Sequence, residues 1–448
     1  MASNDKMYDL IVAGAGPAGT AAAVAAARGG CRVLCIERNG FAGGMATAGL
    51  VNPFLGHFYK NPETGKTGTI IKGIFQEICD RLKARSALKR FYYNGPDSVF
   101  SDAFDDRWLQ IVYDELFREA GVDVLYNAQI ADAECSGSHI ESVTVLGKQG
   151  QFSFSAKGFI DSTGDADLAS LSGIPYEVGR PEDGLCQPCS VMFRVGGIDK
   201  EKLCADGLSA ARQKVGACLR DALEKGRLDF PYKSWLAFYE YPCENVLHFN
   251  ATRVQGQPAL TSEELTQAEM EGRRQAALLC DWLKAEVPCF EHSYLASLPA
   301  QAGVRETRRI KGRYMMDRDD ILEGARFEDG IARSAYFIDI HPPSGKEEPK
   351  KRKGSVRDDR NVSPAQYYEI PLRSLQPENM DNLLVACRAL SSTHEAHGAI
   401  RVMATMTAVG EAAGLAAAVA MDKGISLGEV NGTDVRSAIG YLDAPLEF

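Results

Sequence analysis

The chain has 448 residues, 45% of them hydrophobic and 25% charged, and its 50 Lys and Arg against 60 Asp and Glu give a formal net charge of −10. This composition is typical of a soluble globular protein and excludes disordered, collagen-like and coiled-coil chains. The length allows about three domain-sized units. The negative charge disfavours nucleic acid as a main partner, because an acidic surface repels phosphate backbones.

The sequence pattern predicts neither a secretory signal nor a membrane span. The first ten residues lack the basic segment and apolar segment of a secretory signal. The longest apolar runs, residues 21–27 and 412–420, fall short of the roughly 18 residues that a membrane span needs. We therefore expect a cytoplasmic protein with no membrane segment. The twelve cysteines lie mostly in apolar elements and predict buried free thiols instead of a disulfide framework.

The first chemically informative segment begins near the N-terminus. Residues 8–13 form a short β-rich run, residues 20–28 are strong helix formers, and residues 32–36 form a second β-rich run. The first strand and the helix are joined by Gly14-Ala15-Gly16-Pro17-Ala18-Gly19, a G-x-G-x-x-G motif. This order predicts a βαβ unit with a glycine-rich first turn.

Each glycine of this motif has a physical role in a dinucleotide site. Gly14 permits the tight turn, Gly16 lets the backbone approach a pyrophosphate, and Gly19 lets the helix pack closely on the strand. Glu37 follows the second strand, where a carboxylate accepts hydrogen bonds from ribose hydroxyls and repels a 2′-phosphate. A glycine-rich turn without a ligand is the alternative, but strand, helix, strand and terminal acid together favour dinucleotide binding.

The residues after Glu37 favour FAD over NAD. Residues 38–47 form a second glycine-rich loop, which an extended FAD molecule requires and an NAD site does not. A strand that ends in a Thr-Gly turn at residues 159–167 and another strand at residues 382–388 fit the same interpretation. A helix over residues 403–421 would point its positive N-terminus at the flavin pyrimidine, and its small face would also pack against the first helix.

The chain resembles the FAD-dependent oxidoreductase family with a glutathione-reductase-type FAD domain, which includes the flavin part of heterodisulfide reductase and, more distantly, L-aspartate oxidase and fumarate reductase. The resemblance rests on five motifs and covers nearly the whole chain. The motifs are Gly14 to Gly19, Glu37 to Met45, Asp161 to Asp167, Gly303 to Arg309 and Ser392 to Gly414.

This resemblance implies an α/β fold: a discontinuous Rossmann-like FAD-binding domain (residues 1–170 and 375–448) with an inserted mixed α+β substrate domain (residues 171–374). It implies FAD as cofactor and, as cofactor-binding residues, Gly14, Gly16, Pro17, Ala18, Gly19, Glu37, Arg38, Gly43, Gly44, Met45, Ile130, Thr163, Gly164, Asp165, Arg388 and Arg401. A second G-x-G-x-x-G is absent from the sequence, which argues against a separate NAD(P)H domain. Transient NAD(P)H binding at the flavin and reoxidation by oxygen or a protein stay open.

Further elements are expected from periodicity. An amphipathic helix is expected over residues 101–121, with Phe104, Trp108, Ile111, Val112 and Leu116 on one face, followed by a strand over residues 122–126. In the insertion we expect strands over residues 190–195, 246–252 and 336–340. A helix over residues 263–286 should begin with the capping box of Thr261 and Glu264.

Cys186 and Cys189 form a C-x-x-C pair before a strand. Such a pair can serve as a redox disulfide or as half of a zinc site. The sequence has no second C-x-x-C, which disfavours zinc, and a dithiol relay to flavin stays open as the less favoured interpretation. We expect no metal site.

His394 and His397 are the first candidates for acid–base chemistry, because they precede the helix expected at the flavin. A structural histidine or a metal pair are the alternatives, and His57, Tyr336 and Glu306 are the next candidates for the base. Three arginines form a second candidate set, because guanidinium groups clamp carboxylates and other polar substrates. This set is Arg305, Arg308 and Arg401, for which an ion-pair network between the domains is the alternative.

The sequence thus predicts an FAD-dependent oxidoreductase that transfers hydride between a small polar organic substrate and flavin N5. An electron-transfer flavoprotein is disfavoured, because iron–sulfur cysteine spacing is missing. A flavin monooxygenase is a third possibility. Substrate, direction and electron partner are not predicted.

Overall fold

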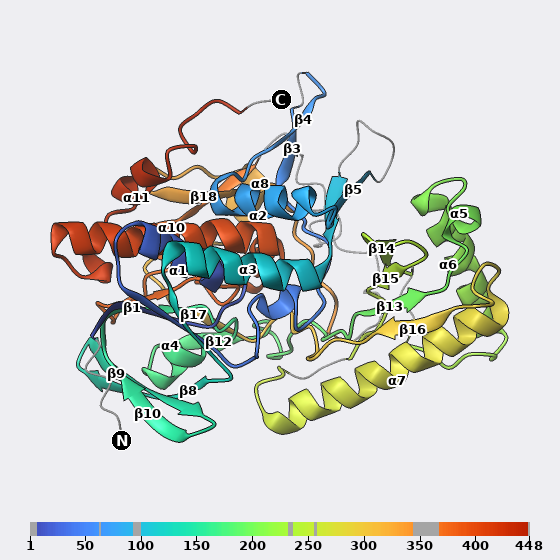
Figure 1. The fold of residues 1–448 in the computed structure, drawn as a ribbon, viewed down its shortest axis with the longest axis horizontal. Helices are drawn as coiled ribbons and strands as arrows, with labels where there is room; N and C mark the ends of the chain where they lie inside the picture. Colours follow the sequence, from blue (N-terminus) through green and yellow to red (C-terminus); the bar gives the residue numbers. More distant parts are fainter. Residues whose placement is uncertain are drawn as a thin grey trace.

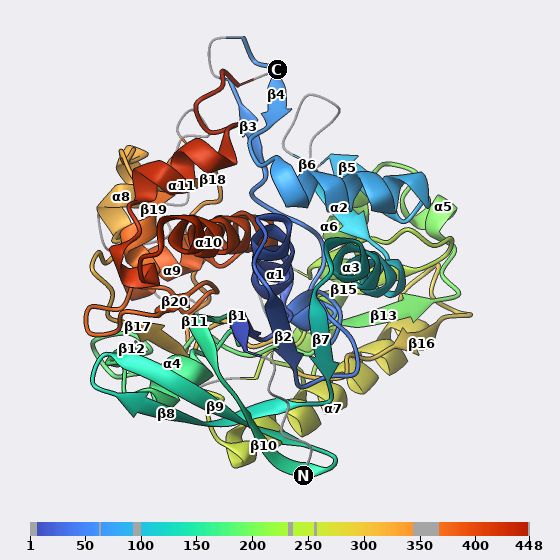
Figure 2. The ribbon, with the colours of Figure 1, turned by 60° about the vertical axis from the view of Figure 1, so that its left-hand side comes forward.

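The computed structural model describes residues 7–61, 64–92, 100–231, 236–254, 258–343 and 367–446. A parallel sheet of five strands lies at its centre, in the order β20-β11-β1-β2-β7 (Figure 2). Their bounds are Tyr8–Ala13 (β1), Val33–Glu37 (β2), Asp123–Tyr126 (β7), Ala156–Asp161 (β11) and Leu383–Val385 (β20). The inner strands are apolar and buried on both faces, as parallel strands covered on both sides must be. Four of these strands therefore come from the N-terminal part of the chain and the fifth, β20, from the C-terminal part.

Three helices cover one face of this sheet: α1 (Pro17–Arg28), α3 (Asp106–Ala120) and α10 (Met403–Lys423). Helices α1 and α10 make the most extensive helix pair in the molecule, because their facing residues are small. A Cβ atom added at Gly410 would lie 1.9 Å from the Ala18 carbonyl oxygen, and one at Gly414 would lie 2.2 Å from that of Ala22. The expected packing of the small face of residues 403–421 against the first helix is confirmed.

The opposite face carries a three-stranded antiparallel sheet, in the order β10-β9-β8, and the short helix α4. The bounds are Gln129–Ser136 (β8), His139–Gly147 (β9), Gly150–Phe154 (β10) and Asp167–Leu171 (α4). The apolar residues of these elements form a second core with the underside of the parallel sheet. The dinucleotide-type sheet is thus covered on both faces.

A separate module lies to the right in Figure 1. It contains an antiparallel sheet in the order β14-β15-β13-β16 and three helices with their own apolar core. The bounds are Phe193–Gly196 (β13), Phe238–Glu240 (β14), Leu247–Phe249 (β15), Tyr294–Ser297 (β16), Lys200–Leu203 (α5), Leu208–Glu224 (α6) and Ser262–Glu286 (α7). Helix α7 begins with the expected capping box of Thr261 and Glu264.

The second half of the expected insertion packs elsewhere. Met316, Ile331 and Ile370 belong to the same core as α1 and α10. The elements involved are Arg318–Glu323 (α8), Gly330–Ser334 (β18), Tyr368–Pro371 (β19) and Leu372–Ser374 (η2). Tyr176–Val178 (β12) and Arg308–Ile310 (β17) pair with each other, and Ile310 belongs to the second core. The sequence boundary at residue 375 therefore falls within residues that share one core with the dinucleotide domain.

The remaining elements surround the α1 face and the C-terminus. They are Gly44–Ala46 (η1), Phe58–Lys60 (β3), Thr67–Thr69 (β4), Gly73–Ala84 (α2), Leu88–Tyr92 (β5), Phe100–Phe104 (β6), His394–Ile400 (α9), Leu427–Glu429 (η3) and Gly432–Ile439 (α11).

Two expected elements are wrong. The helix over residues 101–121 begins only at Asp106, because residues 100–104 pair with β5 as strand β6 and Asp105 caps the helix. Its buried face consists of Leu109, Val112, Tyr113, Leu116 and Phe117, whereas Trp108 and Ile111 are exposed. The strand over residues 336–340 is absent: the paired strand β18 ends at Ser334, and the chain continues without a ladder.

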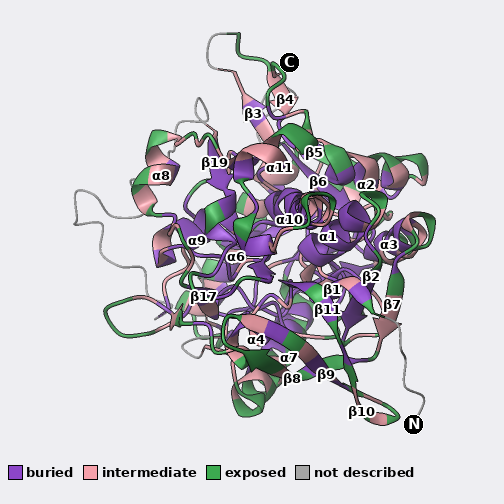
Figure 3. Cartoon of the chain, turned by 90° about the vertical axis from the view of Figure 1, so that its left-hand side faces the viewer, coloured by how far each residue is buried: buried purple, intermediate pink, exposed green. Residues whose placement is uncertain are grey.

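Helix α10 has the length and composition of a membrane span, with a mean hydropathy of 1.4. In this fold, 78% of that window is buried inside the molecule (Figure 3). Its apolar surface is used against α1, α2, α11 and β18. The apolar character is therefore accounted for by its position as the central core helix.

Candidate active site

The first turn of the βαβ unit has the geometry that its glycines predict. Gly14 has φ +92°, and a Cβ there would lie 2.6 Å from the Ser162 carbonyl oxygen. A Cβ at Gly19 would lie 1.8 Å from the Gly14 carbonyl oxygen, so the helix can approach the strand only with glycine. A Cβ at Gly16 would meet no atom within 4 Å. Open space therefore lies in front of the α1 N-terminus, where Gly16 caps the helix without a side chain and Pro17 and Ala18 begin it.

The second glycine-rich loop lies directly beside the first. The backbone N–H of Gly43 donates to the Ala15 carbonyl oxygen at 2.7 Å. A Cβ at Gly44 would lie 3.0 Å from the Gly16 Cα. Met45 follows in η1 and its carbonyl accepts from the Val51 N–H at 2.8 Å. Two glycine-rich segments thus lie against each other at the end of β1.

Glu37 is buried at the tip of β2. Its Oε2 accepts from the Ala15 N–H at 2.8 Å, and its Oε1 accepts from the N–H and the side-chain amide of Asn39, each at 2.8 Å. The carboxylate is therefore fixed beside the α1 N-terminus, whose dipole favours it. Arg38 is exposed and donates to the Gln301 side chain at 3.0 Å.

Two further sequence-predicted cofactor positions lie around this point. The Ala128 N–H donates to the Glu37 carbonyl oxygen at 3.1 Å, which brings the start of β8 to the end of β2. Ile130 is buried two residues further along, within the second core. Asp165 forms an ion pair with Arg388. Gly164 has φ +90°, and a Cβ there would lie 2.8 Å from that guanidinium.

The Thr163 hydroxyl donates to Asp161 at 2.7 Å and holds the turn after β11. Arg308 is used in the same turn: its Nη1 donates to the Asp165 carbonyl oxygen and to the Asp167 carboxylate, each at 2.9 Å. These contacts join a residue of the expected insertion to the turn after β11, in line with the alternative of an ion-pair network between the domains. The structure does not bring Arg308 into a group with Arg305 and Arg401.

His394 lies at the start of α9 and pairs with a buried carboxylate. Its Nδ1 lies 2.8 Å from Glu306 Oε1, and Arg309 Nη1 lies 2.5 Å from the same oxygen. The other oxygen of Glu306 accepts from the Gln187 N–H at 3.0 Å. Because Glu306 accepts, Nδ1 carries the proton and Nε2 keeps its lone pair.

His397 is fully buried one turn later on α9, and both ring nitrogens are without a partner in the described part of the chain. Burial, together with the charges of Arg309 and Arg401, lowers the pKa of His397 well below its ordinary value. This imidazole is therefore neutral at physiological pH. A buried ring with one donor and one acceptor unused is the expected state of a residue that contacts a ligand absent from the structure.

Arg305 and Arg401 do lie near each other. Arg401 donates to the carbonyl oxygen of Asp339 at 3.0 Å, and Arg305 donates to the Pro188 carbonyl oxygen and the Ser190 hydroxyl, each at 2.7 Å. Burial and the charge of Arg401 lower the pKa of Arg305 to about 10. Arg401 also acts electrostatically on His397, so these two arginines lie close to the histidine segment.

The remaining base candidates differ in their surroundings. His57 Nε2 lies 2.9 Å from Asp102 Oδ2, and Arg90 binds the same carboxylate through two contacts of 2.8 Å. The His57 ring packs among the rings of Phe58, Phe75 and Phe100. The Tyr336 hydroxyl donates to Asp339 at 3.1 Å, beside Arg401.

Cys186 and Cys189 are both free and buried in the loop that contacts Glu306 and Arg305. Burial raises the pKa of Cys186 to about 12 and that of Cys189 to about 11. Both thiols are therefore protonated at neutral pH and are weak nucleophiles. Among the described residues, no group of three or more His, Cys, Asp or Glu side chains has the arrangement of a metal site.

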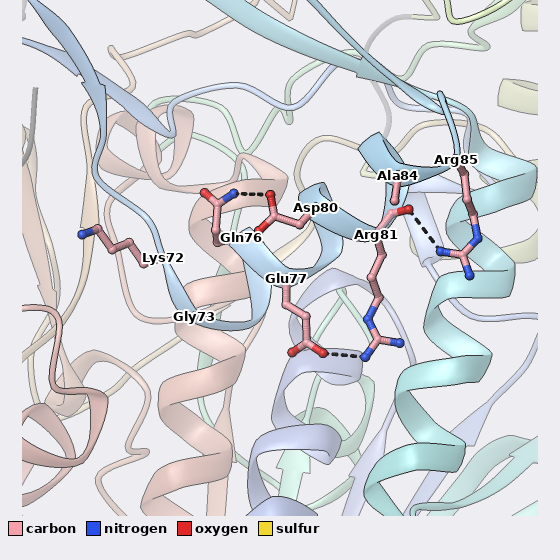
Figure 4. Close-up of a pocket in the computed structure, with 8 residues that line it drawn as sticks. All are labelled: Lys72, Gly73, Gln76, Glu77, Asp80, Arg81, Ala84 and Arg85. Carbon is pink, nitrogen blue, oxygen red and sulfur yellow. Dashed lines mark hydrogen bonds and ion pairs between the residues drawn. The ribbon is translucent and has the colours of Figure 1, made fainter.

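An open groove of about 630 Å³ lies elsewhere, along α2 (Figure 4). Polar side chains of its lining contact one another: Gln76 donates to Asp80 at 2.9 Å, and Arg81 donates to Glu77 at 2.7 Å. It is a surface feature of one helix and contains none of the sequence-predicted site residues.

The residues at the two glycine loops fit FAD. The open space at Gly16, the uncapped α1 N-terminus and the buried carboxylate of Glu37 are the features that a dinucleotide requires. Residues 14–19 would hold the pyrophosphate and Glu37 the ribose. The unpartnered His397 marks a second point where a ligand is needed.

Four residues of the site escaped the sequence analysis: Gln187, Arg253, Asp339 and His341. Arg253 donates to His341 Nδ1 at 3.3 Å, and the His341 N–H donates to the Gln187 side chain at 3.2 Å. Gln187 lies between Cys186 and Cys189 of the C-x-x-C pair, but the other three belong to no local motif, so the sequence carried no signal for them.

Comparison with curated proteins gives a partial match. Thiamine thiazole synthase from Aeropyrum pernix is 33% identical over 138 residues, which cover 31% of this chain and 43% of that protein. The match thus spans less than half of the relative's length.

Two solved structures resemble the fold at low identity. A geranylgeranyl bacteriochlorophyll reductase-like protein from Thermoplasma acidophilum is 13% identical, covers 97% of this chain and 83% of its own, and has a TM-score of 0.49. The p-nitrophenol 4-monooxygenase from Pseudomonas putida is 15% identical, covers 69% of this chain and 70% of its own, and has a TM-score of 0.41.

The family assignment rests on a match across the chain. A family model described as FAD dependent oxidoreductase matches residues 9–439, which includes the parallel sheet, both glycine loops and the histidine segment. The cofactor predicted from the sequence, FAD, is confirmed at the level of the family. The chain belongs to the FAD dependent oxidoreductase family.

Proposed function

We propose that this chain catalyses hydride transfer between a small polar organic substrate and its flavin, with His394 as the acid–base group. Bound FAD supplies at N5 the atom that accepts or donates the hydride. The observation that carries the proposal is the buried pair of Glu306 and His394, whose ring Nδ1 and carboxylate oxygen are 2.8 Å apart.

The proton-handling part of the reaction follows from this pair. Oxidation of an alcohol or amine requires a base that takes the O–H or N–H proton as the hydride leaves. Glu306 fixes the ring of His394 so that Nε2 is the basic atom, and Arg309 and the Gln187 N–H hold the carboxylate in place. A carboxylate that holds a histidine tautomer and stabilises its charged form is a recurring catalytic arrangement.

His397 supports the same site in a different way. Its pKa lies too far below neutrality for efficient proton uptake, because the best base has a pKa near the working pH. It therefore acts as a neutral hydrogen-bonding group toward the cofactor or the substrate. The proposal thus gives His394 and His397 different tasks, whereas the sequence did not distinguish between them.

The test begins with the purified holoprotein and an anaerobic screen for compounds that bleach the flavin. With a reducing compound in hand, single-turnover flavin reduction is measured for His394→Gln, Glu306→Gln and a control, the exposed His292→Asn. We expect His394→Gln to slow reduction by about 100-fold to 10,000-fold, with unchanged FAD content. Glu306→Gln should slow it less and shift the pH profile. Unchanged reduction in His394→Gln would refute the assignment, and a flavin reduced only by a protein partner would refute the proposed reaction.

A further inference from the structure

Three arginines from distant segments of the chain lie near one another and near the histidine segment. We call Arg253, Arg305 and Arg401 the arginine cluster. Arg253 follows β15 in the inserted module, Arg305 precedes β17, and Arg401 ends α9. Arg253 and Arg305 are each 8% exposed, and the Arg401 side chain is 14% exposed. The module and the dinucleotide domain thus both contribute positive charge to one place.

The carboxylate that faces this cluster is that of Asp339. Arg401 Nη2 lies 3.4 Å from its Oδ2, and Asp339 also acts electrostatically on Arg305 and Arg253. Against the effect of burial, His341, Arg401 and Arg305 hold the pKa of Asp339 well below its usual range. Asp339 is therefore charged, but one carboxylate does not balance three guanidinium groups. Because unpaired buried charge is strongly unfavourable, the cluster needs a further anion beyond the carboxylates that the described residues place there.

Unused hydrogen-bond donors occur at the same place. Arg401 Nε and Gln187 Nε2 are buried and have no partner in the described part of the chain. Gln187 is tied to the cluster, because its side-chain oxygen accepts from the His341 N–H, and Arg253 donates to the His341 ring. A carboxylate offers two oxygens and about four lone pairs, which suits converging guanidinium and amide donors.

We propose that the arginine cluster binds a carboxylate group of the substrate, so that the substrate is a small organic acid. The proposal rests on the proposed function, because it names the substrate class of the same site. Gln187 connects the arginine cluster to the Glu306–His394 pair: its side chain contacts His341, and its backbone N–H contacts Glu306. A carboxylate held by the cluster therefore lies next to the pair that handles the proton.

The first test uses the FAD-loaded wild-type protein without turnover. Acetate, malonate, acetamide and inorganic phosphate are titrated in turn, with the flavin absorption spectrum and the melting temperature as readouts. We expect saturable changes with the carboxylates and none with neutral acetamide. Equal binding of acetamide, tighter binding of phosphate than of either carboxylate, or no change with any probe would overturn the proposal.

The second test uses variants of the cluster. Arg253→Gln should weaken carboxylate binding at least about 10-fold, whereas Arg118→Gln, the same charge change on the exposed face of α3, should leave it unchanged. Arg253→Lys retains the charge and serves if the Gln variant does not fold. Equal affinity in wild type and both Arg253 variants would contradict the proposal. Because binding is read without turnover, its outcome is independent of whether His394 proves to be the base.

Discussion

Gly16→Ala offers the sharpest test of the cofactor site, because it separates ligand binding from folding. Gly16 caps α1 with φ −66° and ψ −177°, a conformation that alanine adopts without strain. An added Cβ would meet no protein atom within 4 Å. The new methyl group would instead occupy the space in front of the α1 N-terminus, where we expect the pyrophosphate.

The effects of Gly16→Ala on protein stability and on FAD binding have different magnitudes. Alanine is a poorer N-cap than glycine, which costs up to about 1 kcal/mol, whereas loss of glycine flexibility in the unfolded chain returns about 0.4–1 kcal/mol. The free energy of unfolding of the apoprotein should therefore change by less than about 1 kcal/mol. Loss of one hydrogen bond to a charged phosphate costs about 1.5–3 kcal/mol, which weakens FAD binding roughly 10-fold to 150-fold.

The assay combines urea unfolding of the apoprotein with FAD titration followed by flavin fluorescence. Gly216→Ala on α6 is a suitable control, because the atom nearest to its Cβ is Arg220 Nη1 at 3.7 Å and it lies outside the site. Gly19→Ala is the contrasting variant: its Cβ would lie 1.8 Å from a backbone oxygen, so we expect it to lose stability as well as FAD. Wild-type FAD affinity in Gly16→Ala would refute the placement of the pyrophosphate.

Three further predictions concern other parts of the molecule. Glu37→Ala should weaken FAD retention by roughly 10-fold to 150-fold, the loss of one charge-assisted hydrogen bond, as measured by fluorescence titration. Cys186→Ser/Cys189→Ser should leave the rate of flavin reduction unchanged, because both thiols are buried and protonated; loss of turnover with normal FAD content would make this a dithiol flavoenzyme. Burial raises the pKa of Glu411 to about 7, so the folded chain holds a proton that the unfolded chain releases near pH 4.5. Stability should therefore fall as the pH rises from about 4.5 through 7, and Glu411→Gln should remove that fall of roughly 3 kcal/mol, measured by urea unfolding at pH 5 and pH 8.

The cofactor loops could be predicted from the sequence because their chemistry is local. Gly14, Gly16 and Gly19 act within one turn, and Glu37 is fixed by the length of a single βαβ unit. The capping box of α7 was predictable for the same reason. Where the signal depends only on neighbours along the chain, residue type and spacing determine the geometry.

The helix expected from residue 101 shows how a tertiary contact changes such a pattern. Phe100 to Phe104 pair with β5, so a segment that was expected to begin the helix is used as a buried strand. The shift in the helix start rotates its buried face onto Leu109 and Tyr113 and leaves Trp108 exposed. Periodicity alone does not distinguish a short buried strand from the first turn of a helix.

The arginine cluster could be predicted only in part, since its members come from three segments of the chain. Arg305 and Arg401 stood in recognisable motifs, but Arg253 and Asp339 lie in irregular chain after β15 and β18. The expected strand over residues 336–340 would have pointed alternate side chains to opposite faces. In the irregular segment that replaces it, Tyr336, Asp339 and Arg401 are in contact.

The packing of α10 on α1 links the two halves of the site. Because Gly410 faces the Ala18 backbone with no room for a methyl group, the two helices have one close approach and little freedom to slide. Ala18 belongs to the glycine-rich loop of residues 14–19, and Arg401 lies just before the N-terminus of α10. The distance between the expected pyrophosphate site and the arginine cluster is thus set by backbone-to-backbone contact between segments almost 400 residues apart in sequence. A bulky residue at Gly410 would therefore disturb both sites together, although it lies in neither.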